Sequence, residues 1–221
     1  MREVLAHRGA IHAPLHDDKA GDLALIRDTR RRVPLLITDI AAIQILACVR
    51  AAVRLDGAMA EAGVLMGGSA RLICEAKGPA TLHLFDTFDG PLVDAIGVPQ
   101  GRAAELDGHF GEIRGKLAVV RDLLALYDGV AIHPGIFPAT TAGLADERYS
   151  FVHLDLDLVP STEAALEYFH PRMVPGGIII GDDYQDVALK GLFRRFFAGH
   201  RDTFVEFPWS QVLIVRCGTP N

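Results

Sequence analysis

Apolar residues along this chain form short continuous blocks that alternate with segments of helical spacing. Five such blocks, each bounded by turn residues, predict buried strands at residues 58–64, 81–85, 130–132, 149–156 and 177–180. Around them, apolar positions three and four residues apart predict helices at residues 36–55, 69–76, 116–127, 139–146, 161–170 and 187–198. Strands separated by helices indicate βαβ units, and therefore a parallel sheet with helices on both faces.

The last part of the chain departs from this alternation. Residues 203–207 and 212–215 predict two strands on either side of a turn at Trp209, which indicates an antiparallel hairpin at one edge of the sheet. The predicted fold is a Rossmann-like α/β domain with a seven-stranded, mostly parallel sheet and a C-terminal antiparallel hairpin. Ser161 and Thr162 predict a helix N-cap, because their hydroxyls can accept hydrogen bonds from free backbone N–H groups.

Two segments fall outside the regular pattern. Residues 1–35 are the least regular, and we expect them to form an N-terminal arm or lid before a single domain at residues 36–221. A solvated arm is the alternative for this segment. Residues 89–111 form a long, turn-rich connection, and loops of that length in a compact domain are usually functional lids or disordered.

Composition and charge narrow the class of protein. Half of the 221 residues are hydrophobic and 23% are charged, as in ordinary globular proteins. The net charge of −6 disfavours nucleic acid or an anionic membrane as partner, and no apolar run reaches the length of a membrane span. Residues 1–8 lack the apolar core of a signal peptide, and Cys48, Cys74 and Cys217 lie in apolar stretches. We expect reduced core thiols, a cytoplasmic location and a homodimer.

Acidic residues cluster where two predicted strands end. Asp155 and Asp157 follow one strand, and Asp182 and Asp183 follow the next, at the edge where open α/β sheets bind ligands. If the first strand continues, Asp155 and Asp157 point the same way, about 6.6 Å apart, so that one can bind a metal while the other faces a substrate proton. Crowded carboxylates repel one another unless a cation joins them, and oxygens of Asp155, Asp182 and Asp183 suit a hard cation such as Mg²⁺. The alternative is that Asp157 begins a helix and Asp182 lies in a turn, with no ligand.

A glycine-rich turn follows the first predicted strand. It runs from Glu61 to Ser69 and opens a helix, so its backbone can approach a ligand closely. The carboxylate of Glu61 disfavours a pyrophosphate, whereas a ligand with a cationic centre and an amino-acid portion, such as S-adenosylmethionine, fits better. Asp86 ends the second predicted strand and can accept hydrogen bonds from ribose hydroxyls, with Asp89 as a competitor. A plain turn without a ligand, with Asp86 as its cap, is the alternative.

Four histidines are weaker candidates. His153 shares the strand parity of Asp155, and it is a partner of the metal site, a general base or a hydrogen-bonded core histidine. His109 lies in the long connection, where it is a candidate for substrate contact. His12 and His16 have a metal-like spacing but lie in the arm, so we do not assign them to a metal.

Together these segments resemble the macrocin O-methyltransferase family, from about residue 37 to the C-terminus. The resemblance rests on residues 60–64, 67–69, 84–90, 151–158 and 174–184. Two features depart from the family: Gly90, Pro91 and Leu92 stand where it usually has Gly-Leu-Pro, and the arm has no recognised match.

The resemblance implies a class I methyltransferase fold, S-adenosylmethionine as methyl donor and Mg²⁺-dependent transfer to a hydroxyl of a sugar or another natural product. The implied metal ligands are Asp155, Asp182 and Asp183, with Asp157 as general base. The implied cofactor-lining residues are Glu61, Gly63, Ser69 and Asp86.

The predicted function is thus methylation of a small-molecule hydroxyl acceptor. A metal-dependent hydrolase with the same carboxylates is the alternative, although it leaves the Glu61 turn and Asp86 without a role. A non-catalytic nucleoside-binding protein is a third reading, which the complete set of carboxylates disfavours.

Overall fold

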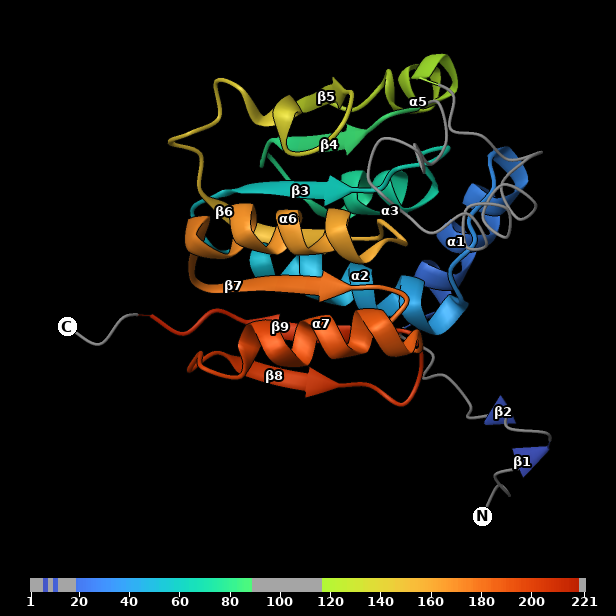
Figure 1. Cartoon of the computed structure of the whole chain (residues 1–221). Helices are drawn as coiled ribbons and strands as arrows, with labels where there is room; N and C mark the ends of the chain where they lie inside the picture. Colours follow the sequence, from blue (N-terminus) through green and yellow to red (C-terminus); the bar gives the residue numbers. More distant parts are fainter. Residues whose placement is uncertain (1–5, 8–9, 12–18, 89–116, 219–221) are drawn as a thin grey trace, which may run out of the picture.

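A seven-stranded sheet forms the centre of the protein. The structure, a computed structural model, describes residues 6–7, 10–11, 19–88 and 117–218. The strands lie in the order β5-β4-β3-β6-β7-β9-β8 (Figure 1). Their bounds are β3 (Ala58–Ala62), β4 (Leu82–Asp86), β5 (Val130–Pro134), β6 (Tyr149–Leu154), β7 (Met173–Gly181), β8 (Thr203–Glu206) and β9 (Val212–Val215). A separate antiparallel pair, β1 (Ala6–His7) and β2 (Ala10–Ile11), lies near the N-terminus.

The strand directions confirm the predicted sheet. Strands β3 to β7 pair in parallel, and β9 runs antiparallel between β7 and β8. The order along the chain reverses between β3 and β6, because β4 and β5 extend the sheet on one side and β7 on the other. Ligands of open α/β sheets bind at such a reversal, beyond the carboxyl ends of the strands.

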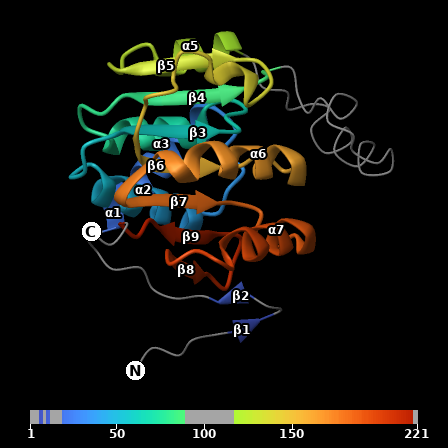
Figure 2. The same ribbon diagram turned by 60° about the vertical axis from the view of Figure 1, so that its left-hand side comes forward.

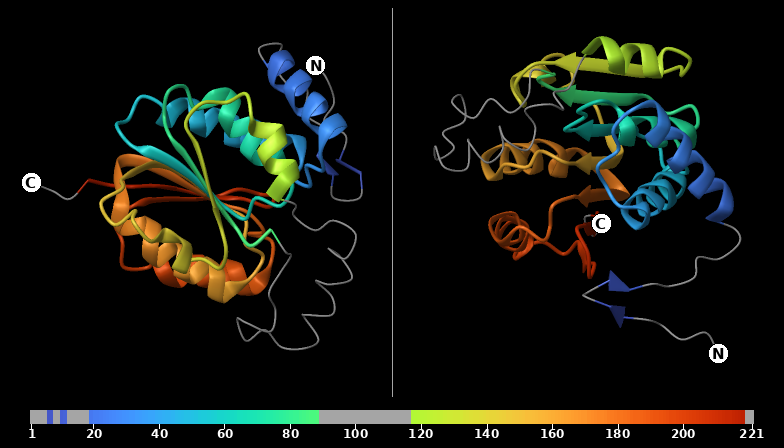
Figure 3. Two further views of the ribbon diagram at one scale, coloured as in Figure 1. Left: turned by 90° about the horizontal axis from the view of Figure 1, so that it is seen from above. Right: turned by 90° about the vertical axis from the view of Figure 1, so that its right-hand side faces the viewer.

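Helices cover both faces of the sheet, as predicted (Figure 3). One face carries α6 (Val159–Phe169) and α7 (Val187–Phe197), which lie side by side in Figure 2. The other carries α2 (Asp39–Ala52), α3 (Gly68–Ala76) and α5 (Leu117–Leu124), with α1 (Ala20–Arg32) packed outside α2 and α3. Among the helices that the structure describes, none has the length and apolar character needed to cross a membrane.

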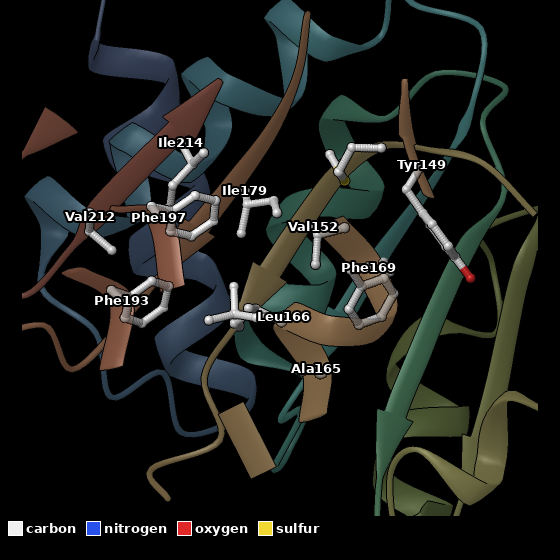
Figure 4. Packing of buried hydrophobic residues seen from close by; sticks show 14 of the residues in the cluster. Tyr149, Val152, Ala165, Leu166, Phe169, Ile179, Phe193, Phe197, Val212 and Ile214 are labelled. Carbon is white, nitrogen blue, oxygen red and sulfur yellow. The ribbon is translucent and has the colours of Figure 1, made fainter. Parts of the chain in front are cut away.

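Alternating strand residues fill two apolar layers. On β3, Ala58, Ala60 and Ala62 face the α6 and α7 side, whereas Met59 faces α2 and α3. Figure 4 shows the first layer, in which Phe169 and Phe193 of the two helices pack onto the sheet. Gly181 of β7 leaves room for the Phe193 ring, since a Cβ there would lie 2.2 Å from it. Such close packing holds the strand ends in place.

Helix α6 begins earlier than the sequence predicts. Its first residue is Val159, so Ser161 lies inside the helix and its prediction as N-cap is wrong. Leu158 occupies the N-cap without a side-chain hydrogen bond, and Pro160 lies in the first turn. Proline suits that place because its fixed φ is helical and its missing N–H would have no partner there.

Two other segments differ from the predicted elements. The helix predicted at residues 139–146 is a single 3₁₀ turn at Ala139–Thr141. Conversely, the pattern predicts no helix at residues 20–32, yet α1 forms there. It is mostly polar. Ile26 is buried in an apolar cluster, and polar contacts add to this attachment: Asp22 accepts from Arg50 of α2 at 2.5 Å, and Arg71 of α3 donates to the Thr29 hydroxyl at 2.6 Å.

The cysteines are only partly as predicted. Cys48 and Cys74 are buried, and burial raises the pKa of their thiols to about 11 and about 12. Cys217 is exposed, so its prediction as a core thiol is wrong. It follows the end of β9, where the chain leaves the sheet.

A buried histidine pair makes the stability depend on pH. Nδ1 of His83 on β4 lies 3.0 Å from Nε2 of His133 on β5. Burial, and then the neighbouring His133, lower the pKa of His83 below its usual 6.5. Since the unfolded chain then binds the proton more readily, this contribution to stability is present above pH 6.5 and is lost as the pH falls below it.

We expect His83→Leu to flatten the fall of the unfolding free energy between about pH 7 and pH 5. Urea titrations at several pH values test this, with the exposed His200→Leu as control; equal slopes would contradict it.

Candidate functional site

A cavity of about 350 Å³ lies at the carboxyl edge of the sheet. Its walls come from the glycine-rich turn after β3, the segment that leads into α2, the ends of β6 and β7, and the turn before β9. The lining residues are Pro34, Leu35, Leu36, Ile37, Thr38, Gly63, Val64, Leu65, Gly68, Ser69, Asp155, Asp157, Asp182, Asp183, Gln185 and Ser210. The structure therefore brings the glycine turn and both acidic clusters to one cavity.

The glycine turn needs its glycines for close packing. Gly63 has a φ of +89°, and a Cβ there would lie 1.7 Å from the carbonyl oxygen of Asp155. At Gly68, a Cβ would lie 2.7 Å from the carbonyl oxygen of Pro34. The turn is thus pressed against two other walls of the cavity. Gly63 and Ser69, both predicted to line a cofactor site, do line this cavity.

Asp86 holds the glycine turn in place. Its Oδ2 accepts from the backbone N–H groups of Val64 and Leu65 at 2.7 and 2.8 Å, and its Oδ1 accepts from Phe88 at 2.7 Å. Among the residues that the structure describes, neither Asp86 nor Glu61 lines the cavity. The geometry shows the turn-capping role for Asp86, and its contact with a ribose stays a prediction; Asp89 lies outside the described residues.

Removal of this cap should loosen the turn. Asp86→Ala leaves three backbone N–H groups without their acceptor, so we expect a loss of about 2–3 kcal/mol in unfolding free energy and weaker binding of S-adenosylhomocysteine. Urea denaturation and calorimetry measure the two effects. Asp122→Ala, on the exposed side of α5, is the control; equal stability of the two variants would contradict the capping role.

The first acidic cluster lies beyond its strand. Strand β6 ends at Leu154, short of the predicted end at Leu156, so the condition under which Asp155 and Asp157 would share strand alternation is not met. The Asp155 N–H still donates to the Ala62 carbonyl at 2.9 Å, but Asp157 has a φ of +60°. The chain turns sharply there to enter α6.

The second acidic cluster is held by hydrogen bonds. The Asp182 N–H donates to the Leu154 carbonyl at 2.8 Å, which ties it to the end of β6. Asp182 Oδ2 accepts from Gln211 at 2.9 Å, and Asp183 Oδ1 accepts from Gln185 at 3.1 Å. Asp183 also has a positive φ, of +53°. These contacts fix the direction in which both carboxylates point.

Two overlapping sets of side chains can hold a metal ion. Asp155, Asp157 and Asp183 offer ligand atoms within 4.8 Å of one another, and so do His153, Asp155 and Asp182. The predicted ligands Asp155, Asp182 and Asp183 are thus divided between the two sets. The first set consists only of oxygens and fits a hard cation such as Mg²⁺. From the sequence, Asp157 is predicted to accept the substrate proton instead, because strand alternation would place it about 6.6 Å from Asp155.

Electrostatics confirm that the carboxylates are crowded. Burial, and then the charge of Asp182, raise the pKa of Asp155 far above its usual range. Burial and the charge of Asp155 do the same to the pKa of Asp157. Burial also acts to raise the pKa of Asp182, but the neighbouring His153 and the hydrogen bond from Gln211 hold it below the usual value. A divalent cation would relieve the repulsion.

His153 and Glu61 form a buried pair below the cavity. Both are fully buried, and His153 Nδ1 donates to Glu61 Oε1 at 2.8 Å. Burial acts to lower the pKa of His153, but Asp182 and Glu61 outweigh it and raise the value to about 10. His153 is therefore a buried histidine held between two carboxylates. Its predicted alternative as a general base fits less well, because the ring does not line the cavity.

A smaller cavity of about 220 Å³ adjoins the first. It is lined by Asp157, Asp183, Gln185, Asp186 and Leu189, so the first three residues face both cavities. No pattern in the sequence pointed to Gln185 or to the segment at residues 34–38 as part of the site. His109 and the rest of the long connection lie outside the described residues.

The chain resembles known proteins in sequence and in fold. The family model for Macrocin-O-methyltransferase (TylF) matches residues 40–203. The 8-demethyl-8-(2,3-dimethoxy-alpha-L-rhamnosyl)-tetracenomycin-C 4'-O-methyltransferase of Streptomyces olivaceus is 36% identical over 138 residues, 58% of this chain and 53% of that protein. The chain thus spans about half the length of this curated relative.

Solved structures share the fold. The O-methyltransferase NovP superposes with a TM-score of 0.68 at 22% identity, covering 80% of this chain and 79% of that one. The TDP-rhamnose 3'-O-methyltransferase CalS11 of calicheamicin biosynthesis gives a TM-score of 0.55 at 16% identity, with coverages of 91% and 96%.

Proposed function

Because the chain belongs to the macrocin O-methyltransferase family, we propose that it transfers a methyl group from S-adenosylmethionine to a hydroxyl of a small molecule, with the help of Mg²⁺. One observation carries this proposal: the glycine turn and the crowded carboxylates line the same cavity. A hydrolase would need the carboxylates but not the turn.

The glycine-turn half of the cavity would bind the methyl donor. Gly63, Gly68 and Ser69 present backbone and a small hydroxyl there, and Asp86 keeps the turn fixed. S-adenosylmethionine supplies an electrophilic methyl group when bound. Glu61 lies two residues before Gly63, inside β3, and supports the turn from below.

The carboxylate half would hold the cation and the acceptor. Asp155 and Asp183 belong to the oxygen-only set, and Asp182 is the neighbouring carboxylate with a lowered pKa. Mg²⁺ supplies positive charge that favours loss of a proton from a nearby hydroxyl. Asp157 would accept that proton, since it faces both cavities and lies beside Asp155 and Asp183. The acceptor oxygen gains the methyl group as it loses the proton.

The acceptor would be a sugar hydroxyl on a natural product. The Streptomyces olivaceus relative is named for methylation of a rhamnosyl group on tetracenomycin C. The smaller cavity suits such a ring, since it combines carboxylates and the amide of Gln185 with the apolar Leu189. Polar groups would bind sugar hydroxyls and Leu189 would pack against a C–H face.

Two measurements test the proposal. Calorimetry with S-adenosylhomocysteine should show binding at one site per chain. A screen of glycosylated natural products with isotopically labelled S-adenosylmethionine should then give label transfer that stops in the presence of a chelator and returns with Mg²⁺. Absence of S-adenosylhomocysteine binding would contradict a methyltransferase, and full transfer in chelator would contradict the role of the cation.

A further inference from the structure

A row of buried polar side chains crosses the sheet beneath the cavity. Glu61 of β3, His153 of β6, Asp182 after β7 and Gln211 before β9 come from four neighbouring strands. Their exposed fractions are 0%, 0%, 6% and 0%. The surrounding side chains on this face of the sheet, beneath α2 and α3, are apolar.

Strand register places the members of the row in contact. Glu61 pairs with His153 across β3 and β6, so both side chains lie on the same face. His153 Nδ1 is 2.8 Å from Glu61 Oε1, and its Nε2 is 3.6 Å from Asp182 Oδ2. Gln211 completes the row with its hydrogen bond to the same Asp182 oxygen. The imidazole ring is thus the link between the two carboxylates.

Two members of the row lie just below residues that line the cavity, and a third, Asp182, lines it directly. Gly63 comes two residues after Glu61, and Asp155 comes two residues after His153. Both of these later residues line the cavity. His153 therefore joins the strand that carries the glycine turn to a carboxylate on the opposite wall.

Such a row is costly for stability alone. Burial of ionised side chains carries a penalty that pairing offsets only in part, and apolar residues often replace such pairs without loss. Here the pairing is incomplete, because Glu61 Oε2, His153 Nε2 and Gln211 Oε1 have no hydrogen-bond partner among the described residues. A structural role alone does not account for these unpaired atoms.

We infer that His153 is a positioning residue that couples the two halves of the cavity, so that a cation at the carboxylates and the nucleoside ligand at the glycine turn strengthen each other's binding. The inference rests on the proposed function, which supplies both ligands. The ring contacts Glu61 and Asp182 from a single position. A cation acts on Asp182 at one end of this contact, and the ligand at the glycine turn acts on the strand of Glu61 at the other, so that each favours the arrangement that the other binds.

Binding measurements on the wild-type protein test the coupling without any substitution. We expect the Kd of S-adenosylhomocysteine, measured by calorimetry, to be lower by about fivefold or more with saturating Mg²⁺ than with a chelator. By reciprocity, S-adenosylhomocysteine should tighten Mg²⁺ binding by the same factor. A ratio of one would overturn the inference.

Two variants of His153 each keep one of the two contacts of its ring and remove the other. The amide nitrogen of asparagine lies near the place of Nδ1, and that of glutamine near the place of Nε2. His153→Asn thus keeps the donor to Glu61, and His153→Gln keeps the donor to Asp182. Each folded variant should still bind both ligands separately, while the coupling ratio falls towards one. His83→Asn, at a buried strand histidine outside the row, is the matched control and should keep the wild-type ratio.

The outcomes distinguish this inference from the proposed function. If the wild-type protein binds both ligands independently, or if both His153 variants keep the full ratio, the coupling is overturned and methyl transfer is not affected. If the wild-type protein binds no S-adenosylhomocysteine, the proposed function fails and the inference with it. Circular dichroism establishes that the variants are folded, and the wild-type ratio remains decisive if they are not.

Discussion

Asp183→Asn should lower methyl transfer by about 10²–10³-fold while leaving the Kd of S-adenosylhomocysteine, measured in chelator, close to its wild-type value. The side chain belongs to the oxygen-only set of possible metal ligands, and it faces both cavities. Asparagine keeps its shape but removes the negative charge that attracts a cation. Turnover on an acceptor from the screen, S-adenosylhomocysteine calorimetry and Mg²⁺ titration measure the three effects.

Asp186→Asn provides the matched control for this prediction. It makes the same change of charge three residues later, in a residue that lines only the smaller cavity. Asp186 caps α7 by accepting from the N–H groups of Ala188 and Leu189, and asparagine is an equally good N-cap. We expect Mg²⁺ affinity near the wild-type value in this variant. If both variants lost the cation equally, the effect would reflect general charge and not ligation.

Gly63→Ala should have the largest effect on the fold. The new methyl group would lie 1.7 Å from the carbonyl oxygen of Asp155 and 2.5 Å from its carbon, at a φ of +89°. Backbone on both sides must then separate, and we expect a loss of about 3–5 kcal/mol in unfolding free energy. S-adenosylhomocysteine binding should be lost as well, because the turn and the carboxylates would move apart.

Gly143→Ala isolates the contribution of the contact from that of the backbone conformation. Gly143 has nearly the same φ, +86°, but no atom lies within 4 Å of its added Cβ. Only the left-handed strain remains there, about 1–2 kcal/mol. Thermal melting compares the two, with about 2–4 °C expected for each kcal/mol. Equal melting temperatures would show that the close approach to Asp155 does not matter.

The sequence predicts the sheet well because each strand leaves a strong local pattern. Continuous apolar runs locate β3, β4, β6 and β7 within a few residues, and the βαβ alternation then requires parallel pairing. Helix α1 escapes prediction because most of its residues are polar, and its polar contacts with Arg50 and Arg71, which add to the burial of Ile26, join residues distant in sequence. Local patterns carry no information about such polar contacts.

The sequence predicts which carboxylates lie in the candidate site but not how they are arranged. The sequence identifies Asp155, Asp157, Asp182 and Asp183 because all follow apolar strands. It does not reveal the sharp turn at Asp157, because a positive φ after β6 cannot be seen in the residue pattern. The structure shows Asp86 as the cap of the glycine turn, and its contact with a ribose stays a prediction.

The pairing of β3 with β6 has a consequence for how the protein acquires its binding site during folding. Glu61 and His153 stand 92 residues apart in the sequence, yet their contact lies directly under both halves of the cavity. Contacts between such distant residues form late, because the entropy of closing a long loop must be overcome first. A nascent chain that has already made its glycine turn therefore has no cavity until β6 has been synthesised and inserted beside β3. Ligand binding can thus serve as a measure of how far the sheet has been completed.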